Sequence, residues 1–214
     1  MQHEDALGLL VHTRGEAATH LLLIRHGQSE WNLSGRRQGQ ADPPLSALGL
    51  RQAAAAARSI GYVDGVVSSD LRRAAETAAI IAGKLDAGPV EADERLRERD
   101  AGEWTGLTRA EIEQHWPGWP DSNRRPTGFE SASSVVSRVL QAFSEIYASK
   151  PGQLLLVVTH GGVIRRLEKS QGICRPHVAH LGGLVVHLSR SGAEVGERIA
   201  LLDSETDVGQ EDQS

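Results

Sequence analysis

The stretch HLLLIRHG, residues 20–27, starts with an apolar run and ends abruptly at a glycine. A short apolar run without alternation predicts a strand that is buried on both faces, here residues 20–25. The stretch LLLVVTHG, residues 154–161, has the same form and is the most apolar strand signal in the chain. Both strands are therefore expected in the interior of a sheet that helices cover on its two faces.

Helical patterns separate these strands from further strand signals. Helices are expected over residues 45–60, where Ser46 is placed to cap and Gly61 to end the helix, and over 71–85 with Asp70 as N-cap. Others are expected over 108–115 and 131–149 and after residue 161. Short strands are expected over 63–69, around Val90 and Leu96, and near 184–188 and 194–201. This order predicts an α/β fold, a three-layer α/β/α sandwich with a mostly parallel central sheet.

The chain has 214 residues, which suits one domain. We expect residues 1–19 to form a flexible N-terminal arm, 20–202 the single domain and 203–214 an acidic disordered tail. Its single cysteine, Cys174, excludes an intrachain disulfide. No apolar run approaches the roughly 18 residues of a membrane span, and the N-terminus does not have the pattern of a secretory signal. A cytoplasmic protein is therefore expected, without a membrane partner.

The chain has a net negative charge, and nearly all of its positively charged residues are arginine. There are 28 Asp+Glu against 23 Lys+Arg, and the pI is near 6.0, which argues against a nucleic-acid partner. Lysine occurs only at residues 84, 150 and 169, so twenty of the cations are arginine. An excess of arginine fits an anion-binding protein. A GC-rich genome would produce the same excess, so composition leaves both explanations open.

Polar residues that could bind a ligand follow three of the predicted strands. In a parallel sheet, ligands bind beyond the carboxyl ends of the strands, and the chain places Arg25-His26-Gly27, Ser68-Ser69 and Thr159-His160-Gly161 there. Each histidine precedes a glycine, which lets backbone N–H groups approach an anion closely. A neighbouring arginine disfavours protonation of an imidazole. The pattern predicts a phosphoryl site with a neutral histidine as nucleophile or base, and no P-loop, dinucleotide fingerprint or zinc spacing accompanies it.

At these residues the chain resembles a known family. The segment LLLIRHGQSEWN is similar to the signature of the histidine phosphatase superfamily, which has the phosphoglycerate-mutase-like fold. The resemblance continues in the family's order through GRRQGQADPPLSALG, SSDLRRAAETA, LRERDAGEWTGL and VVTHGGVI. These five motifs extend from Leu21 to about Ile164, roughly two thirds of the chain, and GEWTGLT resembles the phosphatase branch.

The resemblance implies a set of site residues. They are the catalytic His26, Glu98, His160, Arg25 and Arg73, and the substrate-binding Asn32, Gln38 and Gly161. In the family His26 would attack phosphorus to give a phosphohistidine, and Arg25 and Arg73 would grip the equatorial oxygens. His160 would be cationic against the same oxygens. Glu98 would protonate the leaving oxygen and later activate water.

The chemistry of phosphoryl transfer agrees with these roles. Charge on three equatorial oxygens requires several converging cations, and the guanidinium fork suits them. The sequence offers no clustered carboxylates for Mg²⁺, so we expect neither a metal nor another cofactor. Arg95, Arg97 and Arg99 surround Glu98 in the sequence and would lower its pKa, whereas an acid needs a raised one. Burial or the bound phosphate is expected to dominate.

Structural explanations are preferred for several other residues. We expect Arg72 to be solvated, Ser68 and Ser69 to be turn or capping residues, and Trp104 to pack in the interior. The remaining histidines, at residues 3, 12, 20, 115, 177, 180 and 187, are expected mostly at the surface or in packing.

The segment between residues 116 and 129 is where the family covers its site. Arg124 and Arg125 there could recognise a second anionic group, but an exposed pair is the preferred interpretation. Ala101 stands where phosphatase relatives usually carry an aromatic residue, and the segment is short. Because of these two differences from the family, the sequence does not identify the substrate.

Three functions are compatible with the sequence. The leading one is a metal-independent phosphomonoesterase that acts through a phosphohistidine on a small phosphorylated metabolite. The alternatives are a cofactor-dependent phosphoglycerate mutase and an inactive binding or scaffold relative, which the presence of all five catalytic residues disfavours. The sequence leaves the oligomeric state open, and the resemblance points to a homodimer because members of the family are often dimeric.

Overall fold

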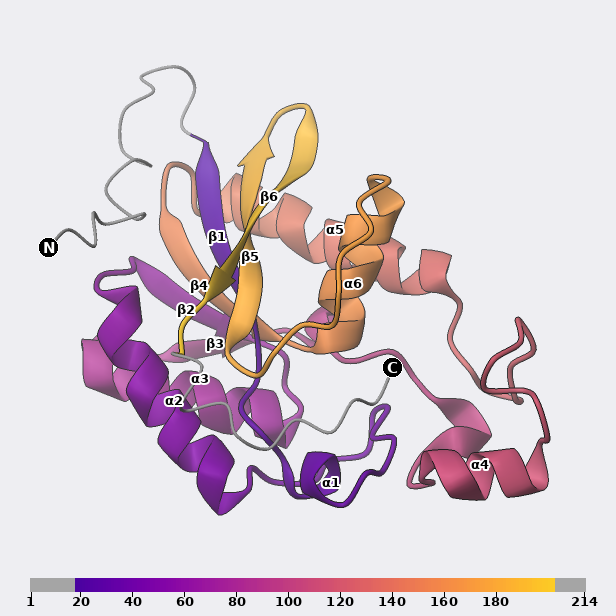
Figure 1. Cartoon of the computed structure of the whole chain (residues 1–214). Coiled ribbons are helices and arrows are strands. Elements are labelled where there is room, and N and C mark those ends of the chain that lie inside the picture. The colour runs from indigo at the N-terminus through magenta and orange to yellow at the C-terminus, as the bar shows by residue number, and fades with distance from the viewer. Residues whose placement is uncertain (1–17, 203–214) are drawn as a thin grey trace, which may run out of the picture.

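The computed structural model describes residues 18–202, so nearly all of the predicted arm and the whole predicted tail lie outside the described residues. Within that range the chain forms one six-stranded sheet in the order β3-β2-β4-β1-β5-β6 (Figure 1). The strands are β1 (Thr19–Arg25), β2 (Gly65–Ser68), β3 (Val90–Ala92), β4 (Leu154–Thr159), β5 (Gly182–Ser189) and β6 (Gly192–Ala200). The first four are mutually parallel, and β5 and β6 add an antiparallel edge. The mostly parallel sheet is thus confirmed.

Helices cover both faces of the sheet, as the three-layer prediction requires (Figure 1). The α-helices are α1 (Glu30–Leu33), α2 (Ala47–Ile60), α3 (Arg72–Leu85), α4 (Arg109–His115), α5 (Ala132–Ser149) and α6 (Gly161–Ser170). Alternate residues of β1 enter two cores: Leu21 and Leu23 pack with α5 and α6, and Leu22 and Ile24 with α2 and α3. None of the helices described is long and apolar enough to cross a membrane.

The helix boundaries test the predicted caps. The Ser46 side chain accepts the N–H of Gly49 at the start of α2, and Gly61 ends that helix at φ 74°. The prediction for Asp70 was wrong: α3 has no side-chain cap, because the Asp70 carboxylate instead binds the Arg97 guanidinium.

The expected strand around Leu96 was wrong as well. Residues Glu94–Leu96 form a single 3₁₀ turn, which begins where the Asp93 side chain accepts the N–H of Arg95. A second 3₁₀ turn covers Gly102–Trp104. The prediction around Val90 was correct, because it lies in β3.

The register of the central strands brings the two histidines together. Arg25 at the end of β1 pairs with Thr159 at the end of β4, so His26 and His160 follow at the same edge of the sheet. On the other side of β1, a Cβ on Gly183 would lie 1.9 Å from the Leu23 carbonyl oxygen. Glycine therefore allows β5 to approach β1 closely, and the chain before β5 to reach the same edge.

Candidate active site

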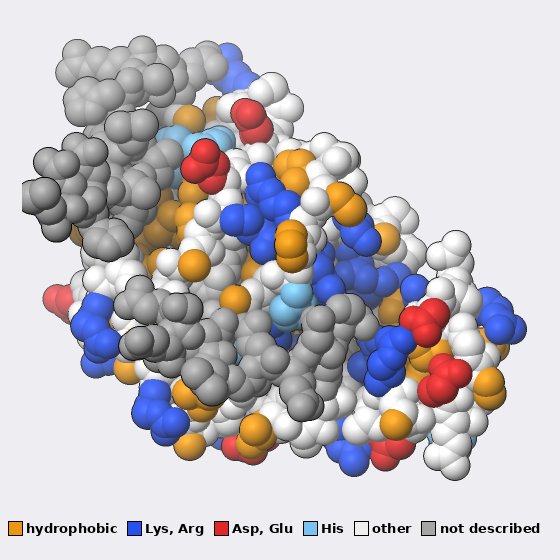
Figure 2. Space-filling model, in the orientation of Figure 1, with side chains coloured by type: hydrophobic (Ala, Val, Ile, Leu, Met, Phe, Trp, Pro, Cys, Tyr) orange, Lys and Arg blue, Asp and Glu red, His pale blue; other side chains and the backbone are white. Residues whose placement is uncertain are grey.

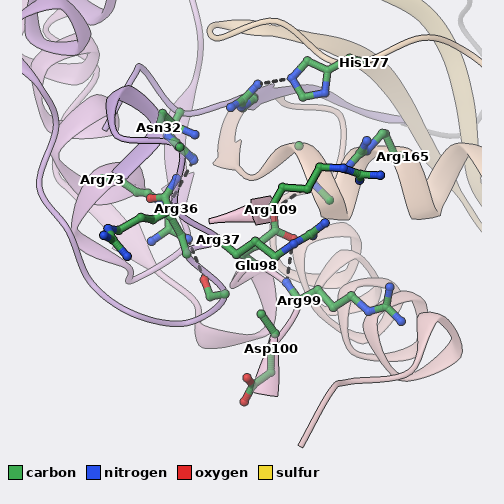
Figure 3. A pocket seen from close by; sticks show the side chains of 18 of the residues that line it. Asn32, Arg36, Arg37, Arg73, Glu98, Arg99, Asp100, Arg109, Arg165 and His177 are labelled. Atoms are coloured by element: carbon green, nitrogen blue, oxygen red, sulfur yellow. Dashed lines mark hydrogen bonds between the residues drawn. The ribbon is translucent and has the colours of Figure 1, made fainter. Parts of the chain in front are cut away.

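A cleft of about 700 Å³ opens at the carboxyl ends of the parallel strands. Seven of the predicted site residues line it: Arg25, His26, Asn32, Gln38, Arg73, Glu98 and Gly161. The eighth, His160, is fully buried beside His26, with 5.2 Å between the ring centroids. The structure therefore gathers all eight in one region, although they come from widely separated parts of the sequence. Figure 3 shows three of them, Asn32, Arg73 and Glu98.

His26 is buried and its proton position is fixed by a backbone carbonyl. Its Nδ1 lies 2.6 Å from the Gly27 carbonyl oxygen, which can only accept, so Nδ1 carries the proton. The lone pair is then on Nε2, to which Arg73 Nε donates over 3.3 Å. Burial first, and then the charges of Arg73, His160 and Arg25, hold the pKa of His26 well below its usual value. This direction agrees with the neutral imidazole expected from the sequence, and burial is its main cause.

Arg73 is fully buried at the start of α3 and is anchored by main-chain oxygens. Its Nη1 donates to the Ala41 carbonyl at 2.7 Å and its Nη2 to that of Gly39 at 2.9 Å. Burial lowers the pKa of Arg73 to about 10, so it stays cationic at neutral pH. Arg72 is exposed and binds Glu76, as predicted.

Arg25 links the site to the segment before β5. Its Nη1 donates to the Val178 carbonyl oxygen and lies 2.7 Å from His177 Nε2. His180, from the same segment, is buried with its ring centroid 6.2 Å from that of His26. Burial, followed by Arg25 and His177, lowers the pKa of His180 to about 2. Sequence reasoning missed both histidines as residues of the cleft, since they resemble the chain's other scattered histidines.

The resemblance implies that His160 is cationic against the phosphoryl oxygens, and without an anion its surroundings favour the neutral form. Burial, followed by Arg73 and Arg138, holds its pKa well below the usual value, so the imidazole is neutral in the free site. Its Nε2 lies 2.9 Å from Ser69 Oγ. Ser69 also accepts the N–H of Leu71, so it is a turn residue as predicted, but its contact with His160 was missed. The available signal was its place at the end of β2.

Glu98 lies on the wall of the cleft and is fixed by two backbone donors. Its carboxylate oxygens accept the N–H of Arg99 at 2.7 Å and of Gly162 at 2.9 Å. A Cβ on Gly162 would lie only 2.1 Å from Glu98 Oε1, so a larger residue here would displace the Glu98 carboxylate. The side chains of Arg95 and Arg97 bind other carboxylates. These two guanidinium groups therefore do not pair with Glu98, which the sequence alone left undecided.

Asn32 and Gln38 are organised by Ser29. Ser29 caps the short helix α1, and its backbone N–H and Oγ both donate to Asn32 Oδ1. Ser29 Oγ also lies 2.8 Å from Gln38 Oε1. Because the amide oxygens bind Ser29, the NH₂ groups are the donors that these side chains can offer to a phosphate oxygen. Gly161 adds the N-terminus of α6 to the same cleft.

The outer part of the cleft is rich in arginine, which the sequence did not reveal. Six arginines besides Arg25 and Arg73 line it: Arg36, Arg37, Arg99, Arg109, Arg165 and Arg166. Figure 3 shows all of these except Arg166. In the sequence they are dispersed among the other arginines of the chain, so only the fold brings them together. In residues 18–202 no three His, Cys, Asp or Glu side chains are grouped so as to hold a metal ion.

The segment 116–129 lies beside the arginine-rich part. Arg124 stacks on Trp119, with 5.0 Å between its Cζ and the ring centroid, and Arg125 is 5.7 Å from the Trp104 ring. Both are exposed, in agreement with the preferred interpretation. Trp104 is buried in a small core with Ala101, so its predicted packing role is confirmed.

Comparisons with known proteins agree with this geometry. Residues 21–170 match the family model described as the histidine phosphatase superfamily (branch 1). Glucosyl-3-phosphoglycerate phosphatase of Mycobacterium tuberculosis is 40% identical over 166 residues, which cover 71% of this chain and 74% of the relative. Metal-independent phosphoserine phosphatase of Arabidopsis thaliana is 32% identical over 89% of this chain and 82% of its own.

Solved structures give the same result. A structure named mycobacterial hydrolase 1 has a TM-score of 0.75 at 30% identity and covers 87% of this chain and all of its own. A mycobacterial glucosyl-3-phosphoglycerate phosphatase in complex with VO₃ has a TM-score of 0.70 at 33% identity. The match covers 79% of this chain and 90% of that structure's chain. The match over most of the chain in sequence and in fold is decisive: this protein belongs to the histidine phosphatase superfamily, with the phosphoglycerate-mutase-like fold.

Proposed function

We propose that this protein is a metal-independent phosphomonoesterase that works through a phosphohistidine at His26. The observation that carries the proposal is the state of that side chain. Its Nδ1 proton is held by the Gly27 carbonyl, which leaves the Nε2 lone pair beside the Arg73 guanidinium at the inner end of the cleft. A neutral imidazole next to fixed cations is what nucleophilic attack on a phosphate dianion requires.

In the first half-reaction Nε2 of His26 attacks phosphorus while the ester P–O bond breaks. The N–P bond forms, the electron pair of the broken bond stays on the leaving oxygen, and Glu98 supplies that oxygen with a proton. Arg25 and Arg73 neutralise the equatorial oxygens, where transition-state charge is spread. His160 is neutral in the free site. A bound phosphoryl group raises the pKa of its imidazole, because the anion favours the imidazolium form.

In the second half-reaction water replaces the alcohol. Glu98, now a carboxylate, takes a proton from water as its oxygen attacks phosphorus, and the N–P bond breaks with its electron pair returning to Nε2 of His26. The products are an alcohol and inorganic phosphate. The enzyme returns to its starting protonation state, so the cycle balances without a metal or redox partner.

The substrate is proposed to be a small phosphorylated metabolite, which fits a cleft of about 700 Å³. Relatives at 40% and 32% identity carry the names of phosphatases for glucosyl-3-phosphoglycerate and phosphoserine. A cytoplasmic location, a homodimeric state and the lack of a nucleic-acid partner stay predictions. Size-exclusion chromatography with light scattering tests the second of these.

The decisive experiment traps the intermediate. Wild-type protein is mixed with a ³²P-labelled monoester in EDTA, quenched in alkali and examined for a label that is alkali-stable and acid-labile, as a phosphohistidine is. We expect labelled wild type and an unlabelled His26→Ala variant that has lost phosphate release. Full activity in His26→Ala would refute the nucleophile, and interconversion of 2- and 3-phosphoglycerate without phosphate release would establish the mutase instead.

A further inference from the structure

The segment before β5 brings into the cleft a histidine that the proposed catalytic cycle does not use. His180 lines the cleft together with Arg25, His26 and His177. Its ring centroid lies 6.2 Å from that of His26, the nucleophile, with an angle of 50° between the ring planes. Figure 2 shows a histidine side chain next to Lys and Arg side chains in the middle of one face, so imidazole and guanidinium groups lie side by side there.

Hydrogen bonds to Arg25 hold the segment around His180 in place. Arg25 Nη1 donates to the Val178 carbonyl oxygen, and the N–H of Leu181 donates to the Arg25 carbonyl oxygen at 3.0 Å. Arg25 Nη1 also lies 2.7 Å from His177 Nε2, and since a guanidinium has only donors, that nitrogen is the acceptor. These contacts lie on both sides of residue 180, and the nucleophile directly follows Arg25 in the chain. The imidazole is therefore fixed relative to the nucleophile.

The imidazole of His180 is buried without hydrogen bonds. The residue is 5% exposed, and neither Nδ1 nor Nε2 has a hydrogen-bond partner among the described residues. A neutral imidazole carries one donor and one acceptor, so both are left unsatisfied. Unsatisfied buried polar groups destabilise a fold, whereas an apolar side chain such as leucine would fill the space without this penalty. Packing alone therefore gives no reason for a histidine at this position.

The backbone next to His180 also has an unfavourable conformation. Leu181 has φ 56°, in the left-handed region, which is unfavourable for a residue with a Cβ. In residues 18–202 the only other non-glycine residue with a positive φ is Asp86, which ends α3 and belongs to a residue type that adopts this region more readily. Such strain is retained mainly at functional sites. Two unfavourable features thus occur at adjacent residues beside the cleft.

His180 is uncharged in the free enzyme. Burial first, and then the charges of Arg25 and His177, lower its pKa to about 2, so it remains neutral in weakly acidic as well as neutral solution. This excludes a role as general acid or base in the free enzyme. A neutral imidazole can still donate its N–H to an anion, and a donor that is already fixed and desolvated stabilises charge better than water does.

We propose that His180 is a further substrate-binding residue, which donates a neutral N–H hydrogen bond to a non-bridging oxygen of the phosphoryl group at His26. This inference rests on the proposed function, because that function places the phosphoryl group on His26. Arg25 and Arg73 supply positive charge to the same group, and His180 adds a donor that does not titrate. The bound oxygen satisfies a donor that has no partner in the free site, so phosphoryl binding relieves an unfavourable feature of the free enzyme.

The test replaces the imidazole by side chains of similar size with and without a donor. His180→Leu removes the donor, and we expect kcat/KM for 4-nitrophenyl phosphate and for glycerol 3-phosphate to fall by the same factor, about 10- to 100-fold. The factor should be the same because the lost bond is to the phosphoryl group and not to the leaving group. His180→Gln retains an N–H donor and should stay within about fivefold of wild type. The matched control is His115→Leu, at an exposed histidine that does not line the cleft, and it should leave both rates unchanged.

Two further measurements separate this role from a structural one. His180→Leu should raise the melting temperature by about 2–4 °C while it lowers activity, because it removes buried atoms that have no partners. The factor lost in kcat/KM should be the same at pH 5.5, 7 and 8.5, because the imidazole is neutral throughout. A lower melting temperature with full activity of the folded enzyme would show that His180 is structural. If His180→Leu does not fold, His180→Ala takes its place, and added imidazole should restore its activity; a failure to restore it would overturn the inference.

The outcomes distinguish this inference from the proposed function. If wild type releases phosphate and His180→Leu keeps its kcat/KM, or if the loss differs between the two esters or varies with pH, the hydrogen bond to the phosphoryl group is wrong and the phosphatase stands. If wild type releases no phosphate from either ester, the phosphatase is wrong. Calorimetry with inorganic phosphate then tests the bond directly. We expect the Kd of His180→Leu to be about tenfold above that of wild type, and equal values would overturn the inference.

Discussion

The two ends of the cleft are built from the same residue types but are held in different ways. At the inner end, Arg73 is fully buried and donates to two carbonyl groups and to His26. At the outer end, Arg99 faces the like charges of Arg166 and Arg125, and a buried nitrogen of Arg166 lacks a hydrogen-bond partner among the described residues. The guanidinium group of Arg73 is thus fixed by hydrogen bonds to main-chain oxygens, whereas that of Arg99 lies among charges of the same sign.

This difference separates chemistry from selectivity. Hydrogen bonds that fix His26 and Arg73 serve any phosphate ester, since every such substrate presents the same phosphoryl group. Charges at the outer end act only on the part of the substrate to which the phosphoryl group is attached. Changes at the inner end should therefore affect all substrates alike, and changes at the outer end should alter the ratio between substrates.

The largest effect is expected at Arg73. Arg73→Lys keeps the charge, but an ammonium cannot bind the carbonyls of Gly39 and Ala41 and the phosphoryl group together. We expect kcat/KM to fall about 1,000-fold on every ester, the scale of removing one preorganised transition-state donor. The control is Arg72→Lys, at the exposed neighbour, which should change little. A loss confined to one substrate would contradict the role of the inner end.

The buried histidines should make stability depend on pH. His26, His160 and His180 have folded-state pKa values below 6.5, so below that pH the unfolded chain binds protons that the folded chain does not. The free energy of unfolding should be level above pH 7 and fall by up to about 1.4 kcal/mol per pH unit for each of them as pH drops below 6.5.

Urea unfolding at pH 7, 6 and 5 measures this slope. His180→Gln should reduce it by about one third, and the exposed His115→Gln should not. A stability that is constant from pH 7 to 5 would mean that the inner histidines are not held neutral, and it would remove the main contrast between the two ends of the cleft.

Gly162→Ala tests how Glu98 is positioned. The new methyl group would lie 2.1 Å from Glu98 Oε1, so the carboxylate must move from the cleft wall. We expect a loss of about 10- to 100-fold for alkyl phosphates, which need their leaving oxygen protonated, and a smaller loss for nitrophenyl phosphate. Gly83→Ala, in an open position on α3, is the matched control. Equal losses on both leaving groups would argue against the acid role.

The smallest effects are expected at Arg109, which lines the cleft but binds Asp121 at 2.5 Å. Both side chains are more than half exposed, so the pair contributes little. Arg109→Gln should lower kcat/KM for a dianionic substrate by about two- to threefold, because it removes a positive charge that attracts the substrate. Asp121→Asn should raise kcat/KM by a similar factor, because it removes a negative charge that repels the substrate. Equal and large losses in both would show that the pair acts structurally.

The fold and the pairing of His26 with His160 were predictable because local signals determine them, whereas Arg73 and Glu98 were assigned through the resemblance to the family. Apolar runs without alternation marked β1 and β4, and parallel pairing then placed His26 and His160 at one edge. The outer end was not, because arginines far apart in sequence become neighbours only through the packing of α6 against the loops. His180 shows the same limit, since its burial depends on how the chain crosses the sheet before β5.

The N-cap prediction for Asp70 failed because two partners compete for its side chain. Asp70 precedes α3 and has the form of an N-cap, but Arg97 offers it two donors at once. A bidentate ion pair outweighs a single backbone hydrogen bond, so the helix begins without a cap. No property of the residues next to Asp70 reveals this, because Arg97 is 27 positions away.

The anchoring of Arg73 couples the folding equilibrium of this protein to phosphate itself. The guanidinium is fixed before any ligand arrives, so an anion that binds at the inner end pays no cost of ordering it. Inorganic phosphate, the product, then binds the folded chain and not the unfolded one, and it raises the melting temperature in proportion to the logarithm of its concentration above Kd. In a phosphate buffer we therefore expect the enzyme to be both inhibited and stabilised, so that its melting temperature depends on the product that it has to release.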